Sequence, residues 1–284
     1  AALQSWAGAG RIYATRSVAE AHTALLDAWW RDRRTYSDPH EALSKVLMLA
    51  ARNADVDALN ARARLLARLE GHLHGDDVDF ALRGGERITL APGDLVRVRA
   101  NDYRSRRGEG VDVLNGYRGV VREVEPRQGA LVEWRRSGRT YAEWISPDQI
   151  AAGHLSHGYA MTVAAAQGLT CENAYIYGLG ADGHTLYPAM SRAKGASRLY
   201  LPLEAVESLE AQLEHGPVRS PADLLHRAVA AYAATLGDPD DGMVVDELDA
   251  ALAKPKVKKL PTMGFRKTIP RGTKPAPTVQ RRGR

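Results

Sequence analysis

The sequence predicts an α/β domain that is interrupted by a small antiparallel β-barrel. The apolar run Lys45–Ala50 does not alternate with polar residues, as is typical of a parallel strand buried on both faces, and a helical pattern follows it. From about residue 73, short alternating strands replace this pattern, separated by turn residues at Pro92–Asp94, Asn115–Gly116 and Ser137–Gly138. Apolar runs return at Ala174–Tyr177, so we interpret the barrel as an insertion between two parts of one α/β domain.

Helix-start signals and helical spacing predict the first elements. Ser17 and Glu20 have the spacing of a capping box, in which a hydroxyl and a carboxylate bind the free N–H groups at a helix start. Apolar residues of that helix recur at helical spacing, at Val18, Ala21, Leu25 and Trp29. We favour burial of Trp29 and Trp30 in the core over stacking on nucleic-acid bases, because helical spacing is typical of a core-facing stripe.

The net charge of +5 hides a division of the chain. Residues 254–284 carry 11 of the 39 Lys and Arg residues and no Asp or Glu, which leaves 28 basic against 34 acidic residues in the rest. Beyond Leu252 no apolar periodicity remains, and we expect this basic tail to be disordered. It can hold nucleic acid through the phosphates or serve as a linker. Before it, Ser220 and Pro221 begin a helix predicted to run to Gly237.

The cysteine count and the lengths of the apolar runs indicate where in the cell the protein is expected. The single cysteine, Cys171, excludes an internal disulfide bond and favours a reducing cytoplasm. No apolar run approaches the ~20 residues needed to cross a bilayer, so we expect no membrane contact. The chain starts at Ala1 rather than at Met, and we expect it to be a fragment of a longer protein.

The sequence contains no Gly-x4-Gly-Lys-Ser/Thr loop of the kind that binds nucleotide phosphates. Met243–Glu247 ends in Asp-Glu like a Mg²⁺-binding strand, but without a phosphate-binding loop before it we do not interpret it as a metal site. His and Asp residues cluster at His72, His74, Asp76 and Asp77. We interpret this cluster as a solvated loop, because no second cluster completes a ligand set. We therefore predict no metal site in this chain.

The stretches Tyr159–Thr170 and Leu186–Lys194 contain the most specific motifs. The first reads Tyr-Ala-Met-Thr-Val-Ala-Ala-Ala-Gln-Gly-Leu-Thr and the second Leu-Tyr-Pro-Ala-Met-Ser-Arg-Ala-Lys. They resemble motifs V and VI of superfamily 1 helicases of the RecD-like class, which read roughly Tyr-Ala-x-Thr-Val-His-Lys-x-Gln-Gly-x-Thr and Tyr-Val-Ala-x-Thr-Arg-Ala-Arg. Ala51–Asn60 also resembles motif IV of that class. The usual His-Lys pair of motif V is Ala164-Ala165 here, which removes one positive charge.

The resemblance implies roles for single residues. In that class the motif VI arginine points at the γ-phosphate of ATP held by the first motor lobe, and this role falls to Arg192. The residues implied in ATP binding and coupling are Gln167, Gly168, Arg52 and Asn53, and those implied in DNA binding are Thr162 and Thr170. ATP and Mg²⁺ would be bound mainly by the first lobe, which this chain lacks. We therefore expect no ATPase activity from the chain alone.

The predicted barrel resembles the SH3-like subdomain inserted into the second lobe of RecD-like helicases, on residues such as Gly93–Val96 and Gly119–Val120. Its loop Tyr103–Arg107 is basic and contains one aromatic residue. Because this subdomain lies along the DNA strand in that class, the resemblance implies DNA contacts from Asn101, Arg104, Arg106 and Arg107. An ordinary solvated loop is the alternative.

Together these resemblances, over about residues 45–203, imply a RecA-like second motor lobe without the phosphate-binding loop. Its two parts would be residues 11–70 and 153–203, with an SH3-like insertion at 71–152, a helical extension at 204–253 and a disordered basic tail at 254–284. The pattern is most similar to the helicase part of TraA/TrwC-type conjugative relaxases. The implied partners are single-stranded DNA, the missing N-terminal motor lobe and a relaxase domain. A fragment of a standalone RecD-like DNA repair helicase and a non-enzymatic DNA-binding remnant are the alternatives.

Overall fold

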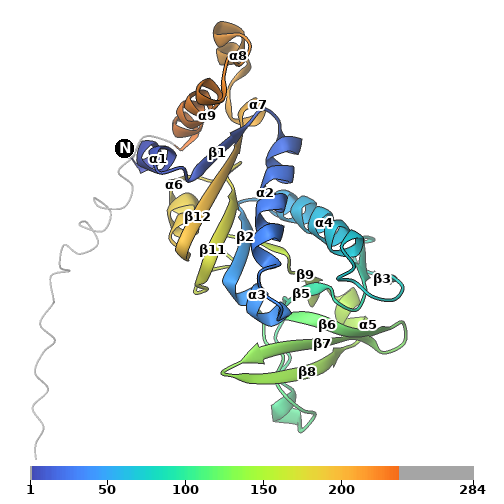
Figure 1. Cartoon of the computed structure of the whole chain (residues 1–284). Coiled ribbons are helices and arrows are strands. Elements are labelled where there is room, and N and C mark those ends of the chain that lie inside the picture. Colours follow the sequence, from blue (N-terminus) through green and yellow to red (C-terminus); the bar gives the residue numbers. More distant parts are fainter. Residues whose placement is uncertain (1, 237–284) are drawn as a thin grey trace, which may run out of the picture. The chain divides into compact units, whose positions relative to one another are not determined.

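The computed structural model describes residues 2–236 (Figure 1). Three sequence predictions lie outside the described residues: the basic tail at 254–284, the motif Met243–Glu247, and the part of the helical extension beyond residue 236. The described chain forms a five-stranded parallel sheet, a five-stranded antiparallel sheet and a two-stranded hairpin. The predicted combination of an α/β part with an antiparallel insertion is confirmed at this level.

The parallel sheet is built from strands that precede and follow the antiparallel part. Its order is β1-β12-β11-β2-β10, and all neighbouring strands are parallel. The strands are β1 (Ile12–Thr15), β2 (Val46–Ala50), β10 (Ala160–Thr162), β11 (Cys171–Tyr177) and β12 (Ala193–Pro202). Every residue of β2 is buried, as its unbroken apolar run predicts, because both faces of the sheet are covered.

Successive residues of β2 enter two different cores. Val46, Met48 and Ala50 pack in a core shared with α2 and α4, whereas Leu47 and Leu49 pack with α6 and α9. The helices are α1 (Ala2–Gly8), α2 (Val18–Arg33), α3 (Pro39–Lys45), α4 (Asn53–Leu69), α6 (Gly183–Met190), α7 (Leu203–Val206), α8 (Leu209–His215) and α9 (Pro221–Thr235). In Figure 1, α2 runs beside β2, and α4 lies to the right of α2.

The helix starts follow the predicted caps. The Ser17 hydroxyl accepts a hydrogen bond from the Glu20 N–H at 3.2 Å, and the Glu20 carboxylate accepts one from the backbone N–H of Arg16 rather than from that of Ser17. Trp29 and Trp30 are 2% and 5% exposed, which confirms that both are core residues.

The antiparallel part surrounds a third core, which includes Trp134 and Val96. Its elements are β3 (Val78–Ala81), β4 (Arg87–Leu90), β5 (Leu95–Val98), the 3₁₀-helix η1 (Arg104–Arg107), β6 (Arg118–Glu125), β7 (Gly129–Arg136), β8 (Arg139–Ile145), α5 (Pro147–Ala151) and β9 (Leu155–His157). The sheet order is β8-β7-β6-β5-β9, while β3 and β4 pair only with each other. Because β8 and β9 are outer strands, hydrogen bonding among the described strands does not close into a ring.

The chain leaves the antiparallel sheet later than the sequence suggested. Leu155–His157 were assigned to the second part of the α/β domain, but they form β9 and pair with β5. The chain re-enters the parallel sheet at Ala160, beside β2. A three-residue strand carries too short an apolar pattern to show which sheet it joins, and tertiary pairing decides this.

A buried carboxylate joins the two parts. Asp94, which lies just before β5 and is fully buried, accepts hydrogen bonds from the Ala91 N–H (2.7 Å), the Tyr159 hydroxyl (2.7 Å) and Nε of Arg64 (3.1 Å). Arg64 belongs to α4 and Tyr159 immediately precedes β10, so a single side chain fixes the antiparallel part to the parallel sheet.

Candidate functional site

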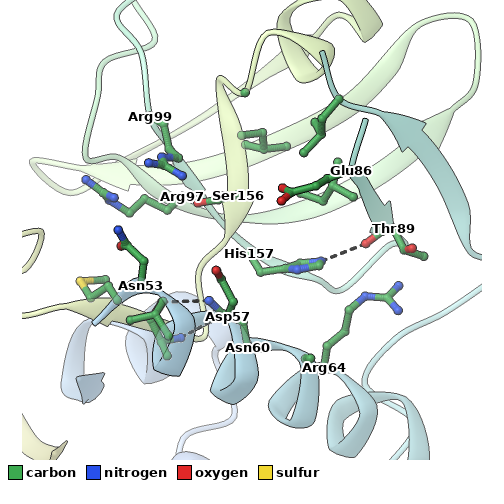
Figure 2. Close-up of a pocket in the computed structure, with 18 of the residues that line it drawn as sticks. Asn53, Asp57, Asn60, Arg64, Glu86, Thr89, Arg97, Arg99, Ser156 and His157 are labelled. Carbon is green, nitrogen blue, oxygen red and sulfur yellow. Dashed lines mark hydrogen bonds between the residues drawn. The ribbon is translucent and has the colours of Figure 1, made fainter. Parts of the chain in front are cut away.

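A cleft of about 740 Å³ lies where α4 and β10 face the antiparallel part. Figure 2 shows its polar side chains, which come from α4, from the β4 hairpin, from β5 and from β9. Neither part of the protein forms the cleft alone. The lining includes Asn53, Asp57, Asn60, Arg97, Arg99 and Thr162.

Arg97 and Arg99 are the cleft arginines without an acidic partner within residues 2–236. Arg97 lies on β5 and Arg99 follows two residues later, so both side chains project toward the same side of the strand, as Figure 2 shows. Burial lowers the pKa of Arg97, and repulsion from Arg99 lowers it further. The other two arginines of the cleft, Arg64 and Arg87, are paired with Asp77 and Asp79.

Carboxylates occupy only part of the cleft wall. Asp57 on α4 and Glu86 next to β4 also line it, and both are exposed. A polyanion that enters the cleft would therefore be repelled from their side and attracted to the side formed by Arg97 and Arg99. The cleft thus offers one electropositive wall rather than a uniformly basic surface.

Hydrogen bonds hold the floor of the cleft in place. The Asn60 side chain accepts from the backbone N–H of Ala160 at 2.8 Å and donates to its carbonyl oxygen at 3.4 Å, which ties α4 to β10. His157 contacts the carbonyl oxygen of Thr89 through Nε2 at 2.9 Å. Burial lowers the pKa of His157, so its ring is neutral at pH 7 and adds no charge to the cleft.

Two of the residues predicted from the motifs lie in this cleft. Asn53 is the first residue of α4, and Thr162 is the last residue of β10. The Thr162 hydroxyl accepts a hydrogen bond from the Ala165 N–H at 3.1 Å, which starts the turn that follows β10. Arg52 lies next to Asn53, but its guanidinium is held by the Asp55 carboxylate through two hydrogen bonds of 2.7 and 2.9 Å.

Arg192 lies at the other end of the parallel sheet. It stands between α6 and β12, its side chain is partly buried, and its Nε is buried without a hydrogen-bond partner in the described residues. At the start of β11, Cys171 pairs with Ala193, the residue after Arg192. At the end of β11, Tyr177 pairs with Ala50, two residues before Arg52. Six residues of strand span roughly 20 Å. The structure therefore does not bring Arg192 together with Arg52 and Asn53.

The turn between β10 and β11 carries the remaining motif V residues. Gln167, Gly168 and Thr170 lie on this connection, which returns the chain from the Thr162 end of the sheet to the Arg192 end. Gly168 has a φ of +83°, a conformation that favours glycine over residues with a side chain. This segment is thus the direct covalent link between the cleft and the surroundings of Arg192.

The basic segment Tyr103–Arg107, which contains η1, is more internally paired than its sequence suggests. Arg104 donates to Asp102 (2.7 Å), to Glu143 (3.0 Å) and to the carbonyl oxygen of Trp144 (2.8 Å), and its side chain is only 12% exposed. Arg107 pairs with Asp102 and Glu109, both at 2.6 Å. Arg104 therefore anchors the loop to β8 and has little surface left for a phosphate.

Asn101 and Arg106 complete this loop. The Asn101 side chain accepts a hydrogen bond from the backbone N–H of Asn115 at 2.8 Å and so closes the loop. Arg106 is exposed, and its guanidinium lies over the ring of Tyr103 at 4.4 Å from the centroid. Of the three arginines predicted to contact DNA here, Arg106 is the one without a carboxylate partner among the described residues.

Sequence reasoning missed Arg97, Arg99 and Ser156. The alternation Arg97-Val-Arg99 was a usable signal, since it places two cations on one face of a short strand. That these arginines and Thr162 line one cleft could not be inferred, because β5 and β10 are far apart in the sequence and belong to different sheets.

Two further searches cover the described part of the chain. No group of three or more His, Cys, Asp or Glu residues between positions 2 and 236 is placed so that it could hold a metal ion. Over the same residues, every helix is too short or too polar to cross a membrane.

Comparison with known proteins gives sequence relatives and structural likenesses. No family model matches the chain. The sequence is 30% identical over 200 residues to the conjugal transfer protein TraA of Agrobacterium fabrum, an alignment that covers 70% of this chain and 16% of that protein. It is also 30% identical over 192 residues to a protein of Sinorhizobium fredii named "Probable conjugal transfer protein TraA", which covers 64% of this chain and 15% of that one. The chain therefore spans about one sixth of the length of these relatives.

Solved structures of Pif1 helicases resemble the fold at low identity. The Pif1 helicase of Candida albicans matches with a TM-score of 0.39 and 15% identity, over 77% of this chain and 58% of that one. Bacteroides Pif1 bound to single-stranded DNA matches with a TM-score of 0.38 and 16% identity, over 71% and 54%. The sequence comparison carries the relationship: this chain is a homologue of one segment of the TraA conjugal transfer proteins.

Proposed function

We propose that this chain is the second motor lobe of a superfamily 1 DNA helicase that belongs to a conjugative relaxase–helicase, and that its cleft holds single-stranded DNA by the backbone. The observation that carries the proposal is the pair Arg97 and Arg99, two cations in a cleft without a carboxylate partner within residues 2–236. Arg97 is half-buried and Arg99 is exposed, so an anion that enters the cleft can meet both guanidiniums without displacing a carboxylate.

The composition of the cleft favours phosphate contacts over base reading. Asn53, Ser156 and Thr162 add amide and hydroxyl groups that bind phosphate oxygens, whereas the lining contains no Phe, Trp or Tyr on which bases could stack. A motor that moves along DNA needs contacts that do not depend on sequence. The relatives are named for conjugal transfer, in which a DNA strand moves between cells, so a sequence-independent strand path suits this family.

Arg192 is proposed as the residue that meets the γ-phosphate of ATP. Its buried Nε has no partner in the described chain, which suits a guanidinium that is completed by a ligand from a neighbouring lobe. Gln167, Gly168 and Thr170 would couple this end of the sheet to the DNA cleft. ATP and Mg²⁺ would be held mainly by the first motor lobe, since the 284 residues contain no phosphate-binding loop.

We also propose bounds for the domains. The parallel sheet with its helices would be the RecA-like lobe, in two parts at 11–70 and 158–203, and the antiparallel part, which extends to β9, would be the SH3-like insertion at 71–157. In that insertion, Arg106 with Tyr103 is the DNA contact that we propose, while Asn101, Arg104 and Arg107 shape the loop. The proposed partners are the first motor lobe, a relaxase domain and single-stranded DNA.

The test is the affinity of the 284-residue chain for a labelled oligothymidylate across a salt series. Arg97→Gln and Arg99→Gln should each weaken binding and reduce the slope of log K against log salt by about 0.7, the contribution of one phosphate contact to single-stranded DNA. Arg127→Gln is the matched control, because Arg127 is exposed on the β6–β7 turn and does not line the cleft. Equal slopes for all three variants would refute the strand path proposed here.

A further inference from the structure

A second cavity, of about 310 Å³, lies between the end of α2, the end of α4 and β6. It shares no lining residue with the DNA cleft, and nothing in the proposed function accounts for it. Its polar lining is Arg33, Tyr36, Ser37, Glu70, His72, His74 and Arg122.

Arg33 is the least exposed polar residue of this cavity. It is 7% exposed and packs against the ring of Trp29, with its guanidinium carbon 5.8 Å from the ring centroid. Within residues 2–236 its guanidinium has no carboxylate partner, and burial lowers its pKa. Its nitrogens are not among the fully buried unpartnered atoms of the described chain, so they reach the cavity, where an anion can bind them.

The neighbouring charges leave the cavity electropositive. Glu70 is paired with Arg34 at 3.7 Å, and Arg122 shares Glu133 with His40, at 2.5 and 2.7 Å. Arg118 lies close behind Arg33. Burial, and then repulsion from Arg33, lowers the pKa of Arg118 to about 10. No carboxylate between residues 2 and 236 pairs with Arg33 or Arg118, so the potential at the base of the cavity is positive.

The rim supplies further hydrogen-bond donors. Tyr36 and Ser37 carry hydroxyl groups, and the exposed rings of His72 and His74 stand on the opposite side, after α4. His74 is fixed by its backbone N–H, which donates to the carbonyl oxygen of Pro92 at 2.9 Å. A tetrahedral oxyanion accepts several hydrogen bonds at once, and a guanidinium binds two of its oxygens in one plane.

We infer that this cavity is a phosphate-binding site, in which Arg33 binds the phosphate group and Tyr36, Ser37 and Arg122 surround it. The volume admits a free phosphate ion, a small phosphate ester or one backbone phosphate of a nucleic-acid strand. These sources present the same chemistry to Arg33. The site is separate from the cleft of the proposed function, and either one can exist without the other.

The test follows the side-chain Nε–H resonance of Arg33 by ¹H–¹⁵N NMR while the 284-residue chain is titrated with inorganic phosphate. The resonance is assigned by its loss in Arg33→Lys. We expect it to shift with a saturating curve. Ser37→Glu, which adds a negative charge to an exposed rim position, should raise the phosphate concentration at half-saturation about tenfold or more. Ser44→Glu is the control, because Ser44 is equally exposed and does not line the cavity.

A second arm identifies the source of the phosphate. If Ser37→Glu also weakens binding of an oligothymidylate more than Ser44→Glu does, the site receives a DNA backbone phosphate. If only the response to inorganic phosphate changes, the ligand is a free phosphate or a small phosphate ester. An Arg33 resonance that phosphate leaves in place, or that moves alike in both Ser→Glu variants, would overturn the inference. The thermal denaturation curve of each variant shows that it is folded.

Discussion

Whether an arginine of this protein can meet a phosphate is decided by the carboxylates around it. Arg104 and Arg107 stand in a basic stretch of sequence, yet Asp102, Glu109 and Glu143 neutralise them. Arg97 lies in an unremarkable strand and has no such partner in the described chain. The charge available to DNA is therefore not the charge counted along the sequence.

The first residue-level prediction concerns Arg192. In the complete protein, Arg192→Ala should lower kcat for DNA-stimulated ATP hydrolysis by something on the order of 10³, with a much smaller change in KM, because the charge acts mainly on the transition state. Arg198→Ala is a useful comparison, since Arg198 lies on β12, which begins directly after Arg192, and is already engaged with Asp32 and Tyr175. A wild-type rate in Arg192→Ala would show that the alignment of motif VI is wrong.

The second residue-level prediction uses Asp102. Burial raises its pKa, but hydrogen bonds from Arg107, Arg104 and Gln149 outweigh this and lower the pKa to about 2. A carboxylate with a depressed folded-state pKa contributes stability that is present above its ordinary pKa of ~4 and is lost as the pH falls toward the folded value.

We therefore expect Asp102→Asn to lower the free energy of unfolding by about 2 kcal/mol at pH 7 and by much less near pH 2. Urea denaturation at both pH values measures this difference. Asp27→Asn serves as the control, because Asp27 is exposed on α2 and makes no side-chain hydrogen bond in the described chain. A difference between Asp102→Asn and wild type that is independent of pH would contradict the assignment.

At the scale of elements, α4 contacts the cleft, the parallel sheet and the antiparallel part. Its first residue, Asn53, lines the cleft, its middle binds β10 through Asn60, and its Arg64 reaches the buried Asp94 of the antiparallel part. The loop after α4 then forms one side of the second cavity. A shift of this helix would change the cleft and the cavity together.

The junction at Asp94 gives a prediction at this scale. Asp94→Asn should lower the free energy of unfolding by about 3 kcal/mol, because it leaves Arg64 partly unpaired in a buried site. Asp79→Asn, whose side chain is 53% exposed on β3, should change it by less than about 0.5 kcal/mol. Urea denaturation of both variants checks this, and similar effects would mean that Asp94 is not the joint between the two parts.

At the scale of the whole molecule, the charge is divided between a net acidic body and a basic tail at 254–284. The body should repel a polyanion except at local sites such as Arg97 and Arg99. The tail contains 11 cations and one aromatic residue, Phe265, so it can neutralise phosphates but can read few bases.

Deleting residues 254–284 should therefore weaken binding to all single strands alike and flatten the salt dependence. If about half of the tail charges meet phosphates, the intact chain should show a slope of about −4 to −5 in log K against log salt. A chain with the tail Lys and Arg residues replaced by Gln separates the effect of charge from that of length. A slope unchanged by the deletion would make the tail a linker and leave binding to the cleft.

Patterns among residues that are close in sequence were sufficient to predict several elements of this protein. The unbroken apolar run of β2, the cap at Ser17 and the helical spacing of Trp29 each depend on neighbours in sequence, and the structure agrees with all three. The stretches Tyr159–Thr170 and Leu186–Lys194 are likewise continuous in sequence, and their resemblance led to the same TraA family as the full comparison.

Tertiary structure decided what depends on residues far apart in the chain. Positions that are tens of residues apart are joined by the pairing of β9 with β5, by the neutralisation of Arg104 by Glu143, and by the cleft that Arg97 and Thr162 both line. Sequence spacing carries no signal for such contacts, because they are selected by the packing of whole elements. The sequence thus determined the class of the protein, and the fold determined which of its charges are free to bind.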